Sequence, residues 1–450
     1  MDTCSVFDFF SGKVYMQSIP ALVQVAVVFV LVVIASARKI HLGLAAALGG
    51  FVLALWRGML PLVAVRTAFA EVINPDTVLL VLLMACIMAF STAMKKSGAM
   101  AAFSSSLAAL APSPRIAMAL APMLIGTLPV PGGAILSAPL VDAMDPERTR
   151  SAAVLSAANY WFRHSLELAW PLYPAFILTS SLTGLGAGRL MALNFYAMPV
   201  LLTAGLLFIL PPLRLVSAAV PGPRVALGPR LRAFASGFAP LALVLGSYIL
   251  LDRLWSTVSP SLGLAPALAA LIGRFGPIYM GIAVGSLKVA LSPTGSGAFR
   301  NSIGLATLKL IAVIVGIRVF SVLLGAAGIA DAVSGELAAA GIPTLVAVAV
   351  LPLVAGLITG VGFGYVGLAF PIVLGLVPAG GTFPREAAVV LAGAFGYAGM
   401  MLSPLHVCMV VTSEHFGVGL AATIRRFALP LGVFVAVAMG YVSLLAFALD

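Results

Sequence analysis

Two stretches of the chain share one unusual pattern, and they decide the fold: residues 121–139 are APMLIGTLPVPGGAILSAP, and residues 351–371 are LPLVAGLITGVGFGYVGLAFP. Both are as apolar as membrane helices, and both are interrupted near the middle by Pro or Gly. A continuous helix through residues 128–133 would lose backbone hydrogen bonds. In lipid, such a loss is tolerated only where the backbone is buried in protein or lines a wet cavity. Paired interruptions in two halves of a chain are typical of the binding site of a secondary transporter.

The composition around these stretches is that of a membrane protein. Of the 450 residues, 62% are hydrophobic and only 9% are charged, far less charge than a soluble surface needs. At about 20 residues per span, the chain has room for roughly ten to twelve membrane elements. We therefore expect an all-α polytopic membrane protein with about ten transmembrane helices. We expect two inverted repeats, each with a broken, re-entrant helical hairpin, in the inner (plasma) membrane of the cell.

Charge and repeated motifs divide the chain. The net charge of +11 comes from bases scattered in short loops, which indicates a positive-inside bias rather than nucleic-acid binding. WPLY at 170–173, followed by LTS at 178–180, corresponds to SPLH at 403–406, followed by VTS at 411–413. We predict an N-terminal tail (1–20), a first repeat (21–212), a basic cytoplasmic linker (213–233) and a second, inverted repeat (234–450).

The individual spans follow from the apolar runs. In the first half we expect them at 21–37, 42–56, 77–94, 116–141 (broken), 152–182 and 191–210. In the second half we expect elements at 238–251, 265–272, 278–291, 303–324, 344–377 (broken), 387–411 and 427–449. Lys95 and Lys96 end the third span of the first half, whereas the equivalent point of the second half carries Asp331 and Glu336. This difference favours inverted halves.

Ionisable groups inside apolar stretches are candidates for function because inserting each one costs about 2.5 to 3.5 kcal/mol. The densest set lies at 159–167 and contains Asn159, Arg163, His164 and Glu167. On a continuous helix Arg163 and Glu167 are four residues apart and can pair, while His164 faces elsewhere. Two interpretations stay open: a structural ion pair that neutralises itself, or an anion site with proton coupling.

The equivalent region of the second half contains Ser403, His406, Thr412, Ser413 and Glu414. His406 is either a packed, hydrogen-bonded histidine or a proton coupler, since imidazole titrates near neutral pH. Glu414 lies near the expected cytoplasmic end and is either a coupling group or an interfacial side chain.

The expected hairpin tips supply backbone groups for binding. Half-helices that end at such tips offer free N–H groups to an anion, and exposed carbonyls at the other ends suit Na⁺. The alternative is a structural kink or close helix packing at glycine. The residues predicted at or beside the tips are Pro129, Pro131, Gly132, Gly133, Ser137, Gly360, Gly362 and Gly364.

Enzymatic and metal chemistry find little support in the sequence. The three cysteines are an odd count, and Cys86 and Cys408 lie in apolar runs, where we expect buried small side chains. The chain contains neither an HExxH motif nor paired cysteines with zinc spacing. We expect no metal, no cofactor and no enzymatic activity.

The chain also resembles a known family. The motifs are PVPGGA at 129–134 with SAP at 137–139, LSPLH at 402–406 and TSEHF at 412–416. They resemble a family of uncharacterised bacterial and archaeal integral membrane proteins grouped with the ion transporter superfamily, which includes gluconate, citrate, dicarboxylate and lactate permeases. The resemblance implies inverted repeats, re-entrant hairpins and ion-coupled transport of organic anions, but no particular substrate. The Ser-Asn-Thr signatures of sodium/dicarboxylate carriers are absent from both tips, so the coupling ion stays open.

The sequence thus predicts a secondary transporter, coupled to H⁺ or Na⁺, for a small organic anion such as a carboxylate. Alternating access would expose a site at the paired tips, with Arg163 as counter-charge. The expected coupling residues are His164, Glu167, His406, Thr412, Ser413 and Glu414. A polytopic membrane enzyme, an assembly factor, a channel and an exporter are the alternatives. The expected partners are the anion and the lipid bilayer, without nucleic acid, and a homodimer is one oligomeric state left open.

Overall fold

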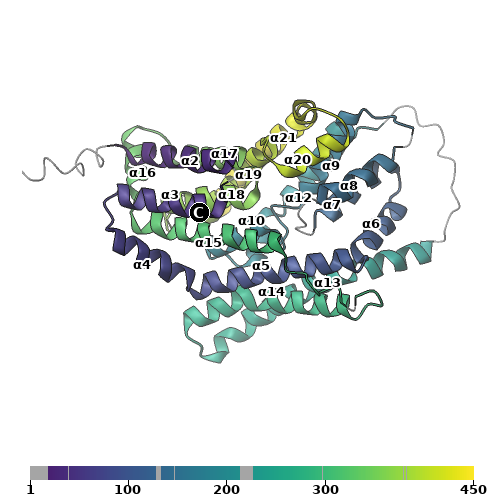
Figure 1. The fold of residues 1–450 in the computed structure, drawn as a ribbon, viewed down its shortest axis with the longest axis horizontal. Helices are drawn as coiled ribbons and strands as arrows, with labels where there is room; N and C mark the ends of the chain where they lie inside the picture. Colours follow the sequence, from purple (N-terminus) through teal and green to yellow (C-terminus); the bar gives the residue numbers. More distant parts are fainter. Residues whose placement is uncertain are drawn as a thin grey trace, which may run out of the picture. The chain divides into compact units, whose positions relative to one another are not determined.

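The computed structural model describes residues 19–38, 40–127, 133–145, 147–212, 227–295, 297–378, 380–381 and 383–449. Every regular element in these ranges is a helix (Figure 1). Contacts divide the chain into two compact units: unit 1 comprises Met1–Val81, Lys309–Ser403 and Gly440–Asp450, and unit 2 comprises Leu82–Leu308 and Pro404–Met439. Each unit therefore draws on both halves of the sequence, and the division into two repeats stays a prediction.

Unit 1 is built from early and late helices. They are α2 (Ala21–Ala37), α3 (Leu42–Trp56), α4 (Pro61–Val72), most of α15 (Leu305–Ala326), α16 (Ile329–Ala339), α17 (Thr344–Thr359), α18 (Gly362–Leu376) and α19 (Arg385–Leu402). Glycines let these helices approach backbone to backbone, as is usual in membrane bundles. A Cβ on Gly399 would lie 1.9 Å from the carbonyl oxygen of Leu353, so α19 packs directly on α17.

Unit 2 holds the middle of the chain and most of the last helix. Its helices are α6 (Ala99–Leu110), α7 (Pro114–Ile125), α8 (Gly133–Ala143), α9 (Ala152–His164), α10 (Pro174–Thr183), α11 (Ala187–Asn194), α12 (Ala197–Ala204) with the π-helical turn η1 (Gly205–Ile209), α13 (Leu227–Val258), the short 3₁₀ turn η2 (Ser259–Leu262), α14 (Pro266–Ala290) and α20 (Val407–His415). Figure 1 shows α13 lying alongside α14. Three helices belong to both units: α5 (Pro75–Lys96), α21 (Leu420–Leu449) and α15, whose first turn belongs to unit 2.

Both predicted interruptions are present. In unit 2, α7 ends at Ile125 and α8 begins at Gly133, and the two helices contact each other. In unit 1, α17 ends at Thr359 and α18 begins at Gly362, with Gly360 between them at φ +63°, a conformation that glycine adopts without strain. At about 1.5 Å per residue, none of these four helices is longer than roughly 24 Å, less than a full hydrocarbon core. Re-entry of these segments into the membrane stays a prediction.

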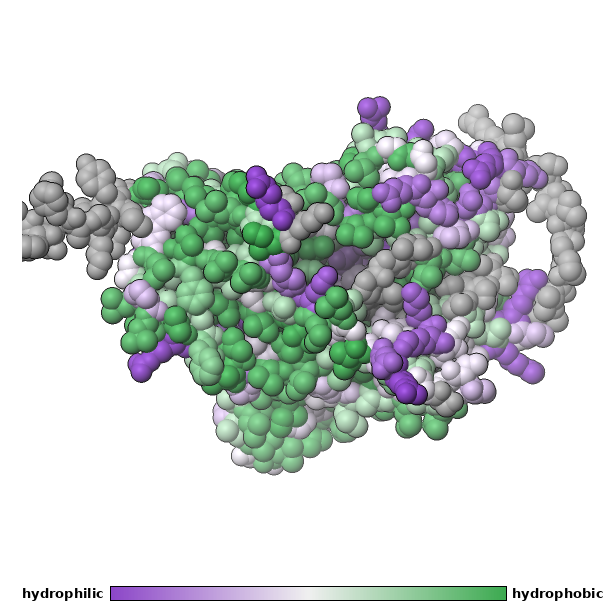
Figure 2. Space-filling model, in the orientation of Figure 1, coloured by the Kyte–Doolittle hydropathy of each residue, from purple (hydrophilic) through white to green (hydrophobic). Residues whose placement is uncertain are grey.

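The outer surface of both units is apolar. Seven helices of the described chain are long and apolar enough to cross a membrane. Large side chains stand exposed along them and on their neighbours, such as Phe69 on α4 and Leu250 on α13, which are 65% and 68% exposed. Figure 2 shows apolar side chains covering most of the visible face over α3 and α4. A surface of this kind suits lipid rather than water.

Unit 1 contains a buried ion pair with a third partner. Arg318 Nη2 lies 2.6 Å from Glu71 Oε1, the Thr77 hydroxyl donates to the same oxygen at 2.6 Å, and Arg318 Nε donates to the Thr77 hydroxyl at 3.0 Å. The three side chains form a closed ring of hydrogen bonds between α4, α5 and α15, which we call the ion-pair ring.

A second carboxylate of unit 1 completes the first helix. Glu336 on α16 accepts hydrogen bonds from the backbone N–H groups of Ala21 and Leu22, at 2.5 and 2.8 Å. These are two of the N–H groups that the start of α2 cannot bond internally. The negative charge also suits the positive end of the helix dipole.

Some predicted boundaries were wrong. Helices α4, α6 and α16 were missed because polar or charged residues interrupt their apolar pattern. The elements expected at 265–272 and 278–291 are one helix, α14, which continues through Pro277. Arg230 and Arg232, expected in a loop, lie on α13; residues 213–226 of the predicted linker lie outside the described residues.

Candidate functional site

One face of α9 carries a stripe of buried polar and aromatic side chains. Ser156, Asn159, Tyr160 and Arg163 follow the spacing of a single helix face, and none is more than 5% exposed. This face packs against α20 and α8. A helix normally buries an apolar stripe, so a buried polar stripe indicates a purpose other than packing.

The first part of the site is a layer of oxygen atoms. The hydroxyls of Ser156 and Thr423 lie 2.9 Å apart, those of Ser413 and Thr423 lie 3.1 Å apart, and the Asn159 amide donates to Thr412 Oγ1 at 2.9 Å. All five residues are at most 2% exposed. The Asn159 carbonyl oxygen, Oδ1, is buried without a hydrogen-bond partner. We call these five residues the oxygen layer.

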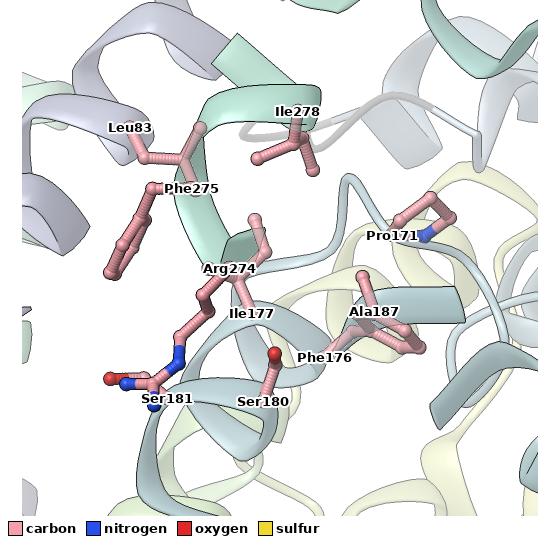
Figure 3. A pocket seen from close by; sticks show the side chains of 10 residues that line it. All are labelled: Leu83, Pro171, Phe176, Ile177, Ser180, Ser181, Ala187, Arg274, Phe275 and Ile278. Atoms are coloured by element: carbon pink, nitrogen blue, oxygen red, sulfur yellow. The ribbon is translucent and has the colours of Figure 1, made fainter. Parts of the chain in front are cut away.

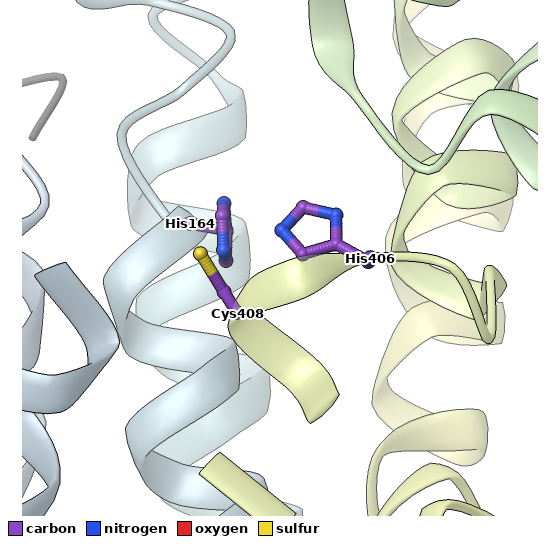
Figure 4. A group of neighbouring side chains, drawn as sticks. All are labelled: His164, His406 and Cys408. Carbon is purple, nitrogen blue, oxygen red and sulfur yellow. The ribbon is translucent and has the colours of Figure 1, made fainter. Parts of the chain in front are cut away.

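The second part is a group of rings at the end of α9. His164 and His406 lie edge to face with ring centroids 4.7 Å apart, and Tyr160 lies 5.2 Å from each. Both histidines are 5% exposed. Cys408, on the first turn of α20, points its sulfur toward His164 (Figure 4). We call His164, His406 and Cys408 the imidazole–thiol cluster.

The expected side-chain geometry at Glu167 was wrong in one respect. Glu167 Oε2 lies 2.7 Å from His164 Nδ1, whereas His164 was expected to face elsewhere. The reason is that α9 ends at His164, so the following residues form turns instead of a further helical turn. The Glu167 carboxylate therefore contacts His164, three positions earlier in the chain, and fixes the orientation of its imidazole ring.

The interrupted helix α7 ends against the same place. A Cβ on Gly126, which follows the last residue of α7, would lie 2.1 Å from the carbonyl oxygen of Arg163. Trp170 Nε1 donates to the carbonyl of Thr127 at 2.7 Å, and the Tyr173 hydroxyl donates to the carbonyl of Arg163 at 3.2 Å. Aromatic donors thus satisfy carbonyls at the ends of both helices. The end of α7 and the charged end of α9 therefore lie against each other.

Arginines mark the opposite end of these helices. Near the start of α7, Arg115 donates to the carbonyls of Leu206 and Leu210 at 2.8 and 2.5 Å. Just before α9, Arg150 donates to the carbonyl of Pro211 at 3.0 Å. Both helices therefore begin near the same two arginines, at what we call the basic level. From there they extend for 12 and 13 residues. At about 1.5 Å per residue, the charged end of α9 lies roughly 18 to 20 Å from that level.

The remaining predicted site residues have different positions. Ser137 is buried on α8 and donates to the carbonyl of Ala134 at 3.4 Å. Glu414 is exposed near the end of α20. Gly133 begins α8, and Pro129, Pro131 and Gly132 lie outside the described residues. Four predicted residues belong to unit 1: Gly360, Gly362, Gly364 and Ser403, the last at the end of α19.

Several residues of the site were missed in the sequence. Ser156 and Tyr160 share a helix face with Asn159 and Arg163, so the helical period could have identified them. Thr423 gave no signal because its partners lie on α9 and α20. Cys408 was expected to be a packed small side chain, yet it lies half-buried beside two histidines; Cys86, also expected to be buried, is exposed.

A small cavity of unit 2 shares no residue with this site. It measures about 20 Å³, room for roughly one or two water molecules, between α5, α10, α11 and α14. Figure 3 shows the Arg274 guanidinium extending toward Ser181 along its wall. The cavity is too small for an organic substrate.

Comparison with known proteins places the chain in a family. Residues 18–258 and 298–446 match the family described as "Protein of unknown function (DUF401)". The chain belongs to the DUF401 family. No curated protein matches it. Among solved structures, this DUF401 protein is similar to the YdaH transporter of Alcanivorax borkumensis, whose crystal structure is described as having an unusual topology.

The similarity to YdaH concerns the fold. The TM-score is 0.58, with 16% sequence identity over 85% of this chain and 89% of that chain. An identity this low shows a shared architecture and leaves activity to be argued from the site. The DUF401 chain is therefore an all-helical, multi-pass membrane protein with the fold of a membrane transporter.

Proposed function

We propose that this DUF401 protein is an ion-coupled secondary transporter of a small organic anion such as a carboxylate. Unit 2 supplies the site: Arg163 is its charged part, and the end of α7 and the start of α8 are its neutral part. Alternating access would then expose this site to each side of the membrane in turn. The fold likeness to a transporter supports this class over an enzyme.

The burial of Arg163 carries the proposal. Its side chain belongs to a helix end that lies roughly 18 to 20 Å from the basic level of α7 and α9, close to the middle of a hydrocarbon core about 30 Å thick. A guanidinium at that depth is costly and normally marks a substrate or ion pathway. Arginine also suits carboxylates because its planar fork can donate two parallel hydrogen bonds.

The oxygen layer favours Na⁺ as the coupling ion. Hydroxyl and amide oxygens are the ligands that hard cations prefer, and the partnerless Oδ1 of Asn159 is a buried acceptor suited to a cation. Thr412, Ser413 and Asn159 would contribute ligands within one layer. Coupling to H⁺ is the alternative and is an outcome of the test below.

The interruption between α7 and α8 supplies the neutral part of the anion site. The start of α8 at Gly133 presents N–H groups and the positive end of a helix dipole, which attract a carboxylate. The interruption between α17 and α18 in unit 1 is the counterpart that inverted repeats would require. The basic level of Arg115 and Arg150 would face the cytoplasm.

Transport into proteoliposomes tests the proposal. The purified protein would be reconstituted and offered a panel of radiolabelled mono-, di- and tricarboxylates under an inward Na⁺ gradient, an inward H⁺ gradient, or neither. We expect concentrative uptake of one chemical class that requires the Na⁺ gradient. Uptake that follows only the H⁺ gradient would reassign the coupling ion. Downhill flux alone would indicate a channel, and no flux of any carboxylate would refute the proposal.

A further inference from the structure

The imidazole–thiol cluster combines three side chains that bind transition metals. One donor atom each from His164, His406 and Cys408 lies within 4.8 Å of the other two. The three residues come from the end of α9, the turn before α20 and the first turn of α20. Figure 4 shows the sulfur and both rings directed into one space. Imidazole and thiolate together suit Zn²⁺ and similar borderline or soft ions.

The surroundings of His164 are those of a metal ligand. Metal-binding histidines usually give their second ring N–H to a carboxylate, which fixes the ring and its tautomer. Glu167 holds His164 Nδ1 in this way at 2.7 Å, so Nε2 is the nitrogen that would bind a metal. An isolated structural ion pair would need neither a second histidine nor a thiol beside it.

The second histidine is incompletely satisfied by the protein. His406 is 5% exposed, and its Nδ1 is buried without a hydrogen-bond partner. His406 precedes the first residue of α20 and has an extended backbone, so it is not part of the helix. A buried polar atom without a partner is destabilising, and an additional ligand would remove that penalty.

We propose that His164, His406 and Cys408 bind a single transition-metal ion of the Zn²⁺ type, with Glu167 as the residue that orients His164. Ligand bonds of about 2.1 Å to nitrogen and 2.3 Å to sulfur at tetrahedral angles require donor separations of roughly 3.4 to 3.7 Å. The cluster reaches this geometry if the side chains close by about 1 Å, a change that rotamer adjustments provide. Three protein ligands leave a fourth position for a water molecule or an oxygen of a small anion.

Metal binding can be measured without any transport assay, so its outcome is separate from that of the proposed function. Full-length protein, purified in detergent with its affinity tag removed and stripped with a chelator, would be titrated with Co²⁺ and then with Zn²⁺. We expect one Co²⁺ per chain with a thiolate-to-cobalt charge-transfer band, and displacement of that band by one equivalent of Zn²⁺. The band reports sulfur ligation directly.

Variants separate a metal site from a merely structural cluster. Cys408→Ser retains a hydrogen-bonding group of similar size and should abolish the charge-transfer band. His406→Gln should weaken Zn²⁺ binding by at least 100-fold, and Glu167→Gln by about 10- to 100-fold. Cys86→Ser, at the exposed cysteine of α5, should leave the band and the affinity unchanged. Size-exclusion profiles would show that each variant is folded.

Three results would overturn the proposal. The first is less than a tenth of an equivalent of Zn²⁺ retained by the folded wild-type protein. The second is a stoichiometric Co²⁺ site whose band survives Cys408→Ser, because the ligands would then lie elsewhere. The third is Zn²⁺ that raises the melting temperature of wild type and Cys408→Ser equally.

Discussion

The ion-pair ring of unit 1 and the polar face of α9 in unit 2 both bury charge among apolar helices, but they are completed differently. In the ring, Glu71, Thr77 and Arg318 bond to one another over 2.6 to 3.0 Å. In unit 2, Asn159 Oδ1 and His406 Nδ1 are buried without a hydrogen-bond partner. Both regions carry the desolvation cost of polar groups, and at the α9 face two buried atoms lack the hydrogen bond that would offset part of it.

The difference separates structure from function. A polar network whose bonds are complete has nothing left to offer a ligand, whereas a buried donor or acceptor without a partner is stable only if something else can occupy it. Both regions contain an arginine, a glutamate and threonine hydroxyls. The state of their bonds is what distinguishes them, and the four predictions below test that distinction.

The largest expected effect lies in the ion-pair ring. Arg318→Ala leaves Glu71 buried without its counter-charge, and we expect the free energy of unfolding to fall by about 3 to 5 kcal/mol. Urea or thermal unfolding in detergent measures it. Replacing the whole ring by apolar residues (Glu71→Leu, Thr77→Val and Arg318→Met) should restore most of the stability and leave transport intact. Lost transport in that stable variant would mean that the ring is part of the mechanism.

The next effect lies at Arg163. The double variant Arg163→Ala with Glu167→Ala removes one charge of each sign, so the protein should stay folded. Relative to Glu167→Ala alone, which also releases His164, transport should fall by about 100-fold, because a charged hydrogen bond to the anion is worth up to about 3 kcal/mol. Initial uptake rates in proteoliposomes measure it, with Arg163→Lys as the variant that keeps the charge. Full transport by the folded double variant would confine anion binding to the backbone of the broken helices.

Matched glycines give a third, smaller effect. Gly126→Ala forces a methyl group to within 2.1 Å of the Arg163 carbonyl, and Gly399→Ala forces one to within 1.9 Å of the Leu353 carbonyl. Both should destabilise by about 1 to 3 kcal/mol through overpacking. Below the melting temperature, only Gly126→Ala should also slow transport, because only it displaces the charged end of α9. Equal loss of transport in both variants would mean that the end of α9 is no more important for transport than the packing of α19 on α17.

The smallest effect concerns two threonines. Thr412→Val removes one hydroxyl from the oxygen layer and should raise the Na⁺ concentration for half-maximal uptake about 3- to 10-fold, which corresponds to roughly 1 kcal/mol. Thr77→Val removes the equivalent hydroxyl from the ion-pair ring and should lower stability without changing the Na⁺ dependence. An unchanged Na⁺ dependence in Thr412→Val would show that the Thr412 hydroxyl is not a ligand of Na⁺.

Much of the local structure followed from the sequence. Helices α2 and α3 have the predicted ends, α7 ends at Ile125 before the predicted interruption, and α17 and α18 are separated at Gly360 as predicted. These features depend on the lengths of the apolar runs and on the backbone restrictions of Pro and Gly, which do not require knowledge of distant partners. The polar residues at 159–167 and 406–413 could also be singled out, because burying them is costly wherever they pack.

The partners of those residues could not be predicted. Asn159 and Thr412 are 253 positions apart, and no local pattern links two such distant residues. The pairing of Glu167 with His164 depended on where α9 ends, and a shift of that end by one turn would have favoured Arg163. Cys408 was treated as apolar because its own neighbours are apolar, although the histidines beside it come from other segments.

The hydrogen bonds from Ala21 and Leu22 to Glu336 have a consequence for the order of synthesis. Glu336 leaves the ribosome 315 residues after Ala21, which at about 5 to 20 residues per second is a delay of roughly 15 to 60 s. Throughout that interval α2 has an incomplete amino-terminal end. These two hydrogen bonds can form only when α16 arrives, so the earliest of the described helices is among the last to be completed.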